Sequence, residues 1–157
     1  MRAITHIAAG AAAAAVAQEV LQPSAGLGIF LFSGLLDVDH VPHFVSSGLP
    51  ARPSALLRSV YSSEEQLESR YPVRRSVPVN VLFPALHCVE LVLLLALAGS
   101  IMNSAFLTWG AAGMVLHLLM DMGSYPCTPG FFSMTWRVLN RRRLLSAWKK
   151  HRSGIDF

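Results

Sequence analysis

Four apolar segments dominate the chain, and their lengths constrain its fold more than any short motif does. They cover approximately residues 4–21, 25–36, 84–100 and 101–120. A helix that crosses a bilayer needs about 20 apolar residues, with a range of about 17–25. The second segment is shorter than that, so we expect its helix to continue through residues 37–44. The sequence therefore predicts an all-α integral membrane bundle of about four transmembrane helices.

Composition agrees with a membrane protein that forms a single domain. Hydrophobic residues make up 53% of the chain and charged residues 14%, whereas soluble domains contain about 25% charged residues. We expect residues 1–135, with a polar cytoplasmic loop at 46–78, to form one membrane domain that is followed by a basic tail at 136–157. The net charge of +4 does not indicate nucleic-acid binding, because the basic residues flank the apolar segments.

The basic residues predict how the helices are oriented. The turns at 22–24 and 99–104 contain no lysine or arginine, and all 13 basic residues lie on the other side of the predicted membrane. By the positive-inside rule that side is cytoplasmic, so we expect a multi-pass inner-membrane protein with both termini in the cytoplasm. One alternative stays open, because the first 17 residues also have the pattern of a cleaved signal peptide.

The tail from residue 136 to residue 152 is rich in lysine and arginine, and it places Val138, Leu145 and Trp148 at helical spacing. These features predict a basic amphipathic C-terminal helix that lies on anionic phospholipid. A solvated basic tail fits the same residues. Membrane lipid is therefore the expected partner of the chain.

The polar residues of the apolar segments gather at one predicted membrane face. In the antiparallel order of the helices, the first and third begin on the cytoplasmic side, and the second and fourth end there. Residues scattered by chance would lie at both faces. Nine histidines and acids fall on the cytoplasmic side: His6, Asp37, Asp39, His40, His43, His87, Glu90, His117 and Asp121.

The chemistry of these residues predicts a metal centre. His117 and Asp121 are four residues apart, and His87 and Glu90 are three apart, so we expect each pair to project from one helix face. Histidine nitrogen with carboxylate oxygen suits zinc, manganese or iron. Four unpaired acids would cost about 10 kcal/mol in the bilayer, at about 2.5–3.5 kcal/mol each. We therefore expect one or two divalent ions, with two preferred. The predicted ligands are His6, Asp37, Asp39, His40, His87, Glu90, His117 and Asp121.

These residues also lie in short motifs whose order resembles that of a known family. Thr5-His6 near the start is followed by LLDVDH at 35–40, by GMVLHLLMD at 113–121 and by Thr-Pro-Gly at 128–130. Over most of residues 1–135 the chain resembles the membrane-bound, predicted metal-dependent hydrolase family of bacteria and archaea. Many members carry a two-histidine motif before the third helix, and of this motif the chain keeps only the final histidine, His87.

The resemblance implies a metal-dependent hydrolase. We expect an enzyme that acts on a phosphoester or lipid-linked substrate at the cytoplasmic membrane face, because the predicted ligands lie at the level of the lipid headgroups. A divalent ion, zinc in the first place, would activate water, and Glu90 or Asp37 would accept the proton of that water. Two other functions fit the same residues: a metal transporter or sensor, and a non-catalytic membrane protein with a structural metal site.

Overall fold

The computed structural model describes residues 3–40, 52–55, 58, 85–122, 129–140 and 142. Within these ranges all regular elements are helices and no strand occurs, in agreement with the predicted all-α class. Most of the predicted loop at 46–78, His43 and the tail beyond residue 142 lie outside the described residues.

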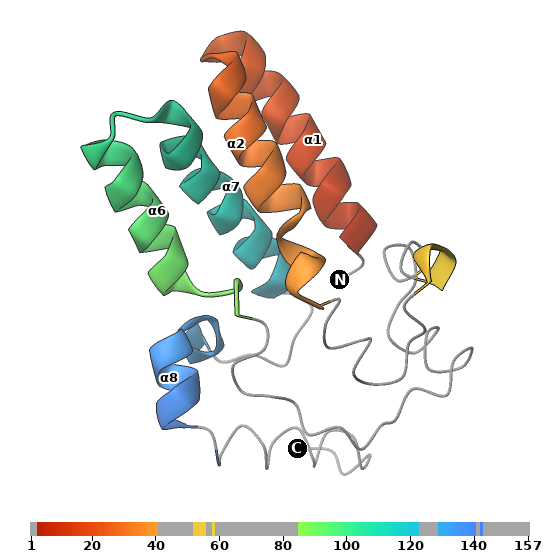
Figure 1. The fold of residues 1–157 in the computed structure, drawn as a ribbon, viewed down its shortest axis with the longest axis vertical. Coiled ribbons are helices and arrows are strands. Elements are labelled where there is room, and N and C mark those ends of the chain that lie inside the picture. The colour runs from red at the N-terminus through yellow and green to blue at the C-terminus, as the bar shows by residue number, and fades with distance from the viewer. Residues whose placement is uncertain are drawn as a thin grey trace.

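Four antiparallel helices form the bundle (Figure 1). α1 (Ala3–Val20) packs along α2 (Pro23–Gly34), α2 packs on α7 (Ala105–Met122), and α6 (Val89–Ile101) packs on another side of α7. The starts of α1 and α6 and the ends of α2 and α7 lie at one end of this bundle. We call it the cluster end.

Two tight turns close the opposite end of the bundle at the predicted positions. Gln22 precedes α2 in an extended conformation, and Pro23 begins the helix, where its missing N–H costs no hydrogen bond. Asn103, between α6 and α7, has a φ of 48°. Asparagine tolerates this left-handed conformation better than most residues do. Both turns therefore follow from the local sequence.

Glycines bring the backbones of neighbouring helices together. A Cβ atom on Gly113 of α7 would lie 2.6 Å from the carbonyl oxygen of Ile29 in α2, and one on Gly26 of α2 would lie 2.7 Å from the carbonyl oxygen of Ala14 in α1. Any larger residue would push these helices apart. The close packing matters for the site, because α1 and α7 and the turn that follows α2 all contribute side chains to it.

The outer surface of the bundle is apolar. α6 exposes Leu93, Leu94, Leu97 and Ile101 by 62–76%. α1 and α7 are long and apolar enough to cross a membrane, whereas α6 is apolar but has only 13 residues. A helix of 13 residues is about 20 Å long, while the hydrocarbon core of a bilayer is about 30 Å thick. Two of the four helices therefore have full spanning length.

The predicted continuation of the second helix through residues 37–44 is wrong. α2 ends at Gly34, and a 3₁₀ turn, η1 (Leu36–Asp39), follows. Leu35 leaves the helical conformation with φ −110° and ψ 5°, and glycine is a weak helix former in the last turn. As a result, Asp37 and Asp39 belong to a tighter turn below the helix.

The predicted start of the third helix is also wrong. α6 begins at Val89, well after the expected start near Pro84, so His87 lies in irregular backbone before the helix. His87 and Glu90 therefore do not project from a common helix face.

A short C-terminal segment packs against the cluster end, and we call it the C-terminal brace. It consists of η2 (Pro129–Phe132) and α8 (Met134–Leu139). α8 overlaps the start of the predicted basic tail helix. Arg137 of α8, however, is only 1% exposed, so it faces the protein and contacts neither lipid nor water.

Candidate metal centre

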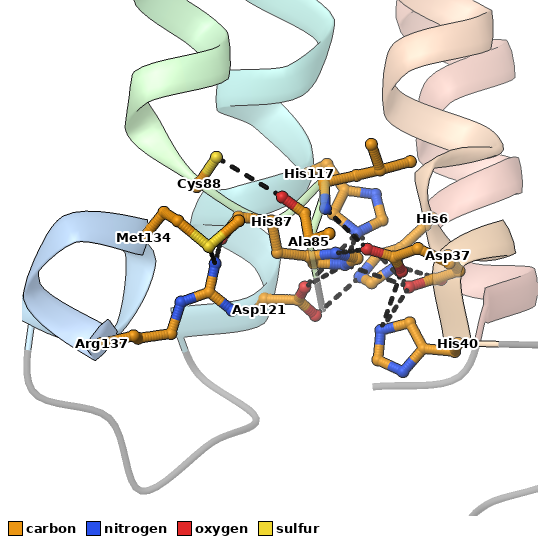
Figure 2. A network of polar contacts seen from close by, with 12 residues as sticks. His6, Asp37, His40, Ala85, His87, Cys88, His117, Asp121, Met134 and Arg137 are labelled. Carbon is orange, nitrogen blue, oxygen red and sulfur yellow. Dashed lines mark hydrogen bonds and ion pairs between the residues drawn. The ribbon is translucent and has the colours of Figure 1, made fainter. Parts of the chain in front are cut away.

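Residues from separate elements point toward one another at the cluster end (Figure 2). His6 comes from the start of α1, Asp37 from η1, His87 from the segment before α6, and His117 and Asp121 from the end of α7. The ring centroids of His6 and His117 are 4.0 Å apart, and those of His87 and His117 are 4.8 Å apart. The topology predicted from hydropathy thus places these side chains together.

Four atoms of this group are separated by distances close to those between the ligand atoms of a tetrahedral ion. Nε2 of His87 and Nε2 of His117 are 3.0 Å apart, and each lies 3.4–3.5 Å from both Asp37 Oδ1 and Asp121 Oδ2. One ligand atom from each of the four residues lies within 4.8 Å of the others. Tetrahedral zinc with bonds of about 2.0–2.1 Å has ligand atoms about 3.3–3.4 Å apart. The spacing therefore fits one tetrahedral ion.

Neighbouring acceptors orient both of these histidines. Nδ1 of His117 lies 2.6 Å from the carbonyl oxygen of Ser33. Since a carbonyl only accepts, Nδ1 donates its proton there and leaves Nε2 for a metal. Nδ1 of His87 donates in the same way to Asp39 Oδ2 at 3.2 Å, and this oxygen also accepts the N–H of Leu86 at 2.8 Å. Metal-bound histidines are commonly fixed by such partners.

We call the four closely spaced atoms the inner atoms. His6 contacts the other oxygen of each carboxylate, the outer one. Its Nδ1 lies 2.8 Å from Asp37 Oδ2, and its Nε2 lies 3.3 Å from Asp121 Oδ1. The inner oxygens of the same two acids face His87 and His117. His6, predicted as a ligand, therefore stands behind the four inner atoms, where it orients the two carboxylates.

Asp39 and His40 form the partly exposed side of the centre. His40 Nε2 lies 3.6 Å from Asp37 Oδ1 and 3.7 Å from Asp39 Oδ1. Asp39, His40 and His87 make a second group with metal-ligand spacing. The side chains of Asp37 and His40 are 18% and 14% exposed, whereas those of His87 and His117 are at most 1% exposed. Solvent therefore reaches the centre from the side of Asp37 and His40.

The helices of the bundle supply no lysine or arginine to the buried carboxylates. α1, α2, α6 and α7 contain no lysine or arginine. Asp121 is 2% exposed, and its Oδ2 has no hydrogen-bond partner. An unsatisfied buried acceptor costs about 1–3 kcal/mol, and more when it is charged. Because Nδ1 of His87 and Nδ1 of His117 both donate elsewhere, a cation between the four inner atoms would satisfy Asp121.

The exposed side of the centre has the protonation states that bind a metal. Burial lowers the pKa of His40 to about 4, so His40 is neutral at pH 7. Burial on its own would raise the pKa of Asp37, but the neighbouring His117, His6 and His87 outweigh it and hold that pKa well below its usual range. Neutral imidazole and ionised carboxylate are the forms that coordinate metals.

Glu90 does not belong to this group, contrary to its predicted role as ligand or general base. Its Oε1 accepts the Ser133 hydroxyl at 2.6 Å and the Thr135 N–H at 3.1 Å, and its Oε2 accepts the Met134 N–H at 3.0 Å. These donors form the start of α8, where a negative charge is favourable. The three-residue spacing from His87 gave the wrong prediction because His87 lies outside α6.

Two contributors to the site were missed by the sequence analysis. Ser33 acts through its main-chain carbonyl, which leaves no trace in a pattern of side chains. Arg137 donates from Nη2 to the carbonyl oxygen of His87 at 3.4 Å, yet in the sequence it is one of many basic residues near the C-terminus. These contacts join residues 84 and 50 positions apart, so local spacing gave no signal for either.

In comparisons with known proteins, no family model, curated protein or solved structure matches this chain. The geometry of the centre is therefore the basis for inferring a function.

Proposed function

We propose that the cluster binds one divalent ion, zinc, through Asp37, His87, His117 and Asp121. The observation that carries this proposal is the spacing of 3.0–3.5 Å between the two Nε2 atoms and from each of them to both carboxylate oxygens, which is close to the spacing around a tetrahedral ion. Two neutral imidazoles and two carboxylates also balance the charge of a divalent ion. Iron accepts the same ligand types, whereas manganese favours octahedral oxygen sites.

One ion fits the residues better than the two preferred from the sequence. The preference for two ions counted Glu90 among the charges to be neutralised, and hydrogen bonds at α8 satisfy Glu90 instead. The second group with ligand spacing shares His87 with the first. His87 would then have to bind ions through both nitrogens, although its Nδ1 is already engaged with Asp39.

We further propose that the four helices lie in a membrane with the cluster end at its cytoplasmic surface. The length of α1 and α7 and the exposed leucines of α6 support this arrangement. The basic residues, which in the sequence adjoin the cytoplasmic ends predicted for the apolar segments, support a cytoplasmic cluster end with both termini on the same side. α1 carries His6 into the centre, which supports a retained helix over a cleaved signal peptide.

For this centre we propose hydrolysis of a phosphoester or lipid-linked substrate. A zinc ion supplies a Lewis acid that activates water. His40 lines the exposed side of the centre, where its imidazole could hydrogen-bond to a water bound by the ion. A lipid-linked substrate can keep its apolar part in the bilayer while its polar group reaches the centre, because the centre lies at headgroup level.

Two rival functions make different predictions. A structural zinc site has four protein ligands and no open position, whereas the proposed hydrolysis requires the ion to bind water as a fifth ligand beside the four residues. The structural site predicts that removal of zinc unfolds the protein and that no substrate is cleaved. A transporter needs polar residues along the whole path, whereas the buried polar side chains among the described residues all lie near the cluster end.

Metal analysis of the detergent-purified protein tests the proposal. We expect about one zinc per chain in the wild type and less than about a tenth of that in His117→Ala, which lacks a ligand. Glu19→Gln, at an exposed position of α1, is the matched control and should retain zinc. Zinc-loaded protein should hydrolyse bis(p-nitrophenyl) phosphate or a short-chain phospholipid, and chelation should abolish this activity. Zinc content near the wild-type value in His117→Ala would refute the centre.

A further inference from the structure

His87 is the proposed ligand that lies in irregular backbone, so other elements must hold it. On one side, Asp39 accepts both the Leu86 N–H at 2.8 Å and the ring N–H of His87 at 3.2 Å. On the other side, Arg137 donates to the carbonyl oxygen of His87 at 3.4 Å (Figure 2). The ring and the main chain of His87 are thus held between η1 and the C-terminal brace.

The C-terminal brace is itself fixed to the bundle beside His87. Phe131 and Phe132 of η2 are buried in an apolar cluster with residues of α6 and α7. At the start of α8, Glu90 accepts three hydrogen bonds, one of them from Ser133, the residue that caps the helix. Because Glu90 lies only three residues after His87, this junction fixes α8 next to the ligand segment.

Arg137 occupies a buried position that an apolar side chain would fill without the cost of desolvating a charge. It is 1% exposed, and its guanidinium lies 5.7 Å from the centroid of the Phe131 ring and 4.0 Å from the sulfur of Met134. Removing a charge from water is costly, so packing alone does not explain an arginine here. What a guanidinium adds is a rigid set of N–H donors with fixed directions.

We propose that Arg137 is a positioning residue for the metal ligand His87, so that the C-terminal brace is part of the metal centre. The inference rests on the proposed function, since it requires that His87 binds the ion. Arg137 acts through the main chain: by holding the carbonyl of His87, it restricts the backbone rotation that would turn Nε2 away from the other ligands. Partners of this kind typically contribute about 10–100-fold to metal affinity.

Substitutions in the full chain test this inference with Co²⁺ as the probe. Arg137→Met keeps a long apolar side chain in the buried position and removes the donor to His87. Arg137→Lys retains a donor, and Arg142→Met removes a positive charge at an exposed position of the same tail. Chelator competition measures Co²⁺ affinity, and the visible spectrum of bound cobalt reports the geometry of its ligands. We expect Arg137→Met to bind Co²⁺ at least about tenfold more weakly with a shifted spectrum. Arg137→Lys should recover part of the affinity, and Arg142→Met should match the wild type.

Three outcomes would overturn the inference, and they differ in what else they affect. Wild-type affinity and spectrum in Arg137→Met would overturn it and leave the metal centre intact. An equal loss in Arg142→Met would also overturn it, because the effect would then be one of overall charge. A wild-type protein that binds no Co²⁺ would overturn the proposed function as well. If circular dichroism shows that Arg137→Met does not fold, Arg137→Leu, which also lacks a donor, replaces it under the same criteria.

Discussion

Two carboxylates at the cluster end, Asp121 and Glu90, have opposite surroundings. Glu90 accepts three hydrogen bonds from the start of α8, so both of its oxygens have donors. Asp121 is buried, and its Oδ2 has no hydrogen-bond partner and lies 3.4 Å from Nε2 of His87 and from Nε2 of His117. A carboxylate that receives enough N–H and O–H donors needs no ion, whereas one that faces the lone pairs of other acceptors does. This difference locates the candidate metal centre, whereas the mere presence of an acid in an apolar helix does not.

Among the substitutions that test this difference, Asp121→Asn should lower zinc affinity the most. The substitution replaces an anionic ligand oxygen by a neutral amide and leaves the ion with one negative charge too few. We expect zinc affinity to fall by more than about 100-fold, beyond the range of about 10–100-fold that is typical of residues that only support ligands. Competition with a fluorescent zinc chelator measures the loss, with Glu19→Gln as the control. Near-normal affinity in Asp121→Asn would mean that Asp121, like Glu90, needs no ion.

The sequence was sufficient to predict that Asp121 belongs to a cluster of histidines and acids. Apolar segment lengths, the turns at Pro23 and Asn103 and the four-residue spacing of His117 and Asp121 are local features, and together they place the histidines and acids at one end of an antiparallel bundle. The assembly of His6, Asp37 and His117 into one group followed from that topology alone.

The surroundings of Glu90 depend on contacts that no local sequence pattern encodes. The partners of Glu90 are two main-chain N–H groups and a hydroxyl located 43–45 residues further along the chain. Whether His87 shares a helix face with Glu90 depends on where α6 begins, and a shift of that boundary by a few residues separated the two side chains. Arg137 looked like a surface cation because its burial results from the packing of η2 and α8.

Asp39→Asn tests an intermediate case. Asp39 accepts hydrogen bonds, as Glu90 does, but it also orients the proposed ligand His87. An amide oxygen can still accept one hydrogen bond, but it holds the ring of His87 less firmly than an anion does. We expect zinc affinity to fall by about 10–100-fold while the zinc content at saturation stays the same. The chelator competition assay measures both quantities. Complete loss of zinc would instead make Asp39 a direct ligand and favour the group of Asp39, His40 and His87.

Glu90→Gln should affect stability more than metal binding. The amide keeps one acceptor oxygen and places an NH₂ group against the donors of α8, so the brace is held less tightly. We expect the free energy of unfolding to fall by about 1–2 kcal/mol, in line with the loss of charged hydrogen bonds. Thermal unfolding in detergent measures this change, and metal analysis should still find wild-type zinc content at saturation. If Glu90→Gln lost its zinc completely, Glu90 would have to be counted among the ligands after all.

Ser133→Ala should have the smallest effect, and it separates the cap of α8 from the charge of Glu90. The Ser133 hydroxyl accepts the Trp136 N–H at 3.1 Å and donates to Glu90 at 2.6 Å, so alanine removes both contacts. Glu90 keeps the main-chain donors of Met134 and Thr135, and for this reason we expect a loss of about 1 kcal/mol with unchanged zinc content. Thermal unfolding measures the loss, and Ser100→Ala, at an exposed position of α6, is the control. Loss of zinc in Ser133→Ala would show that the junction at α8 is required for metal binding. Glu90 and Asp121 would then both contribute to zinc binding, and would differ only in how much.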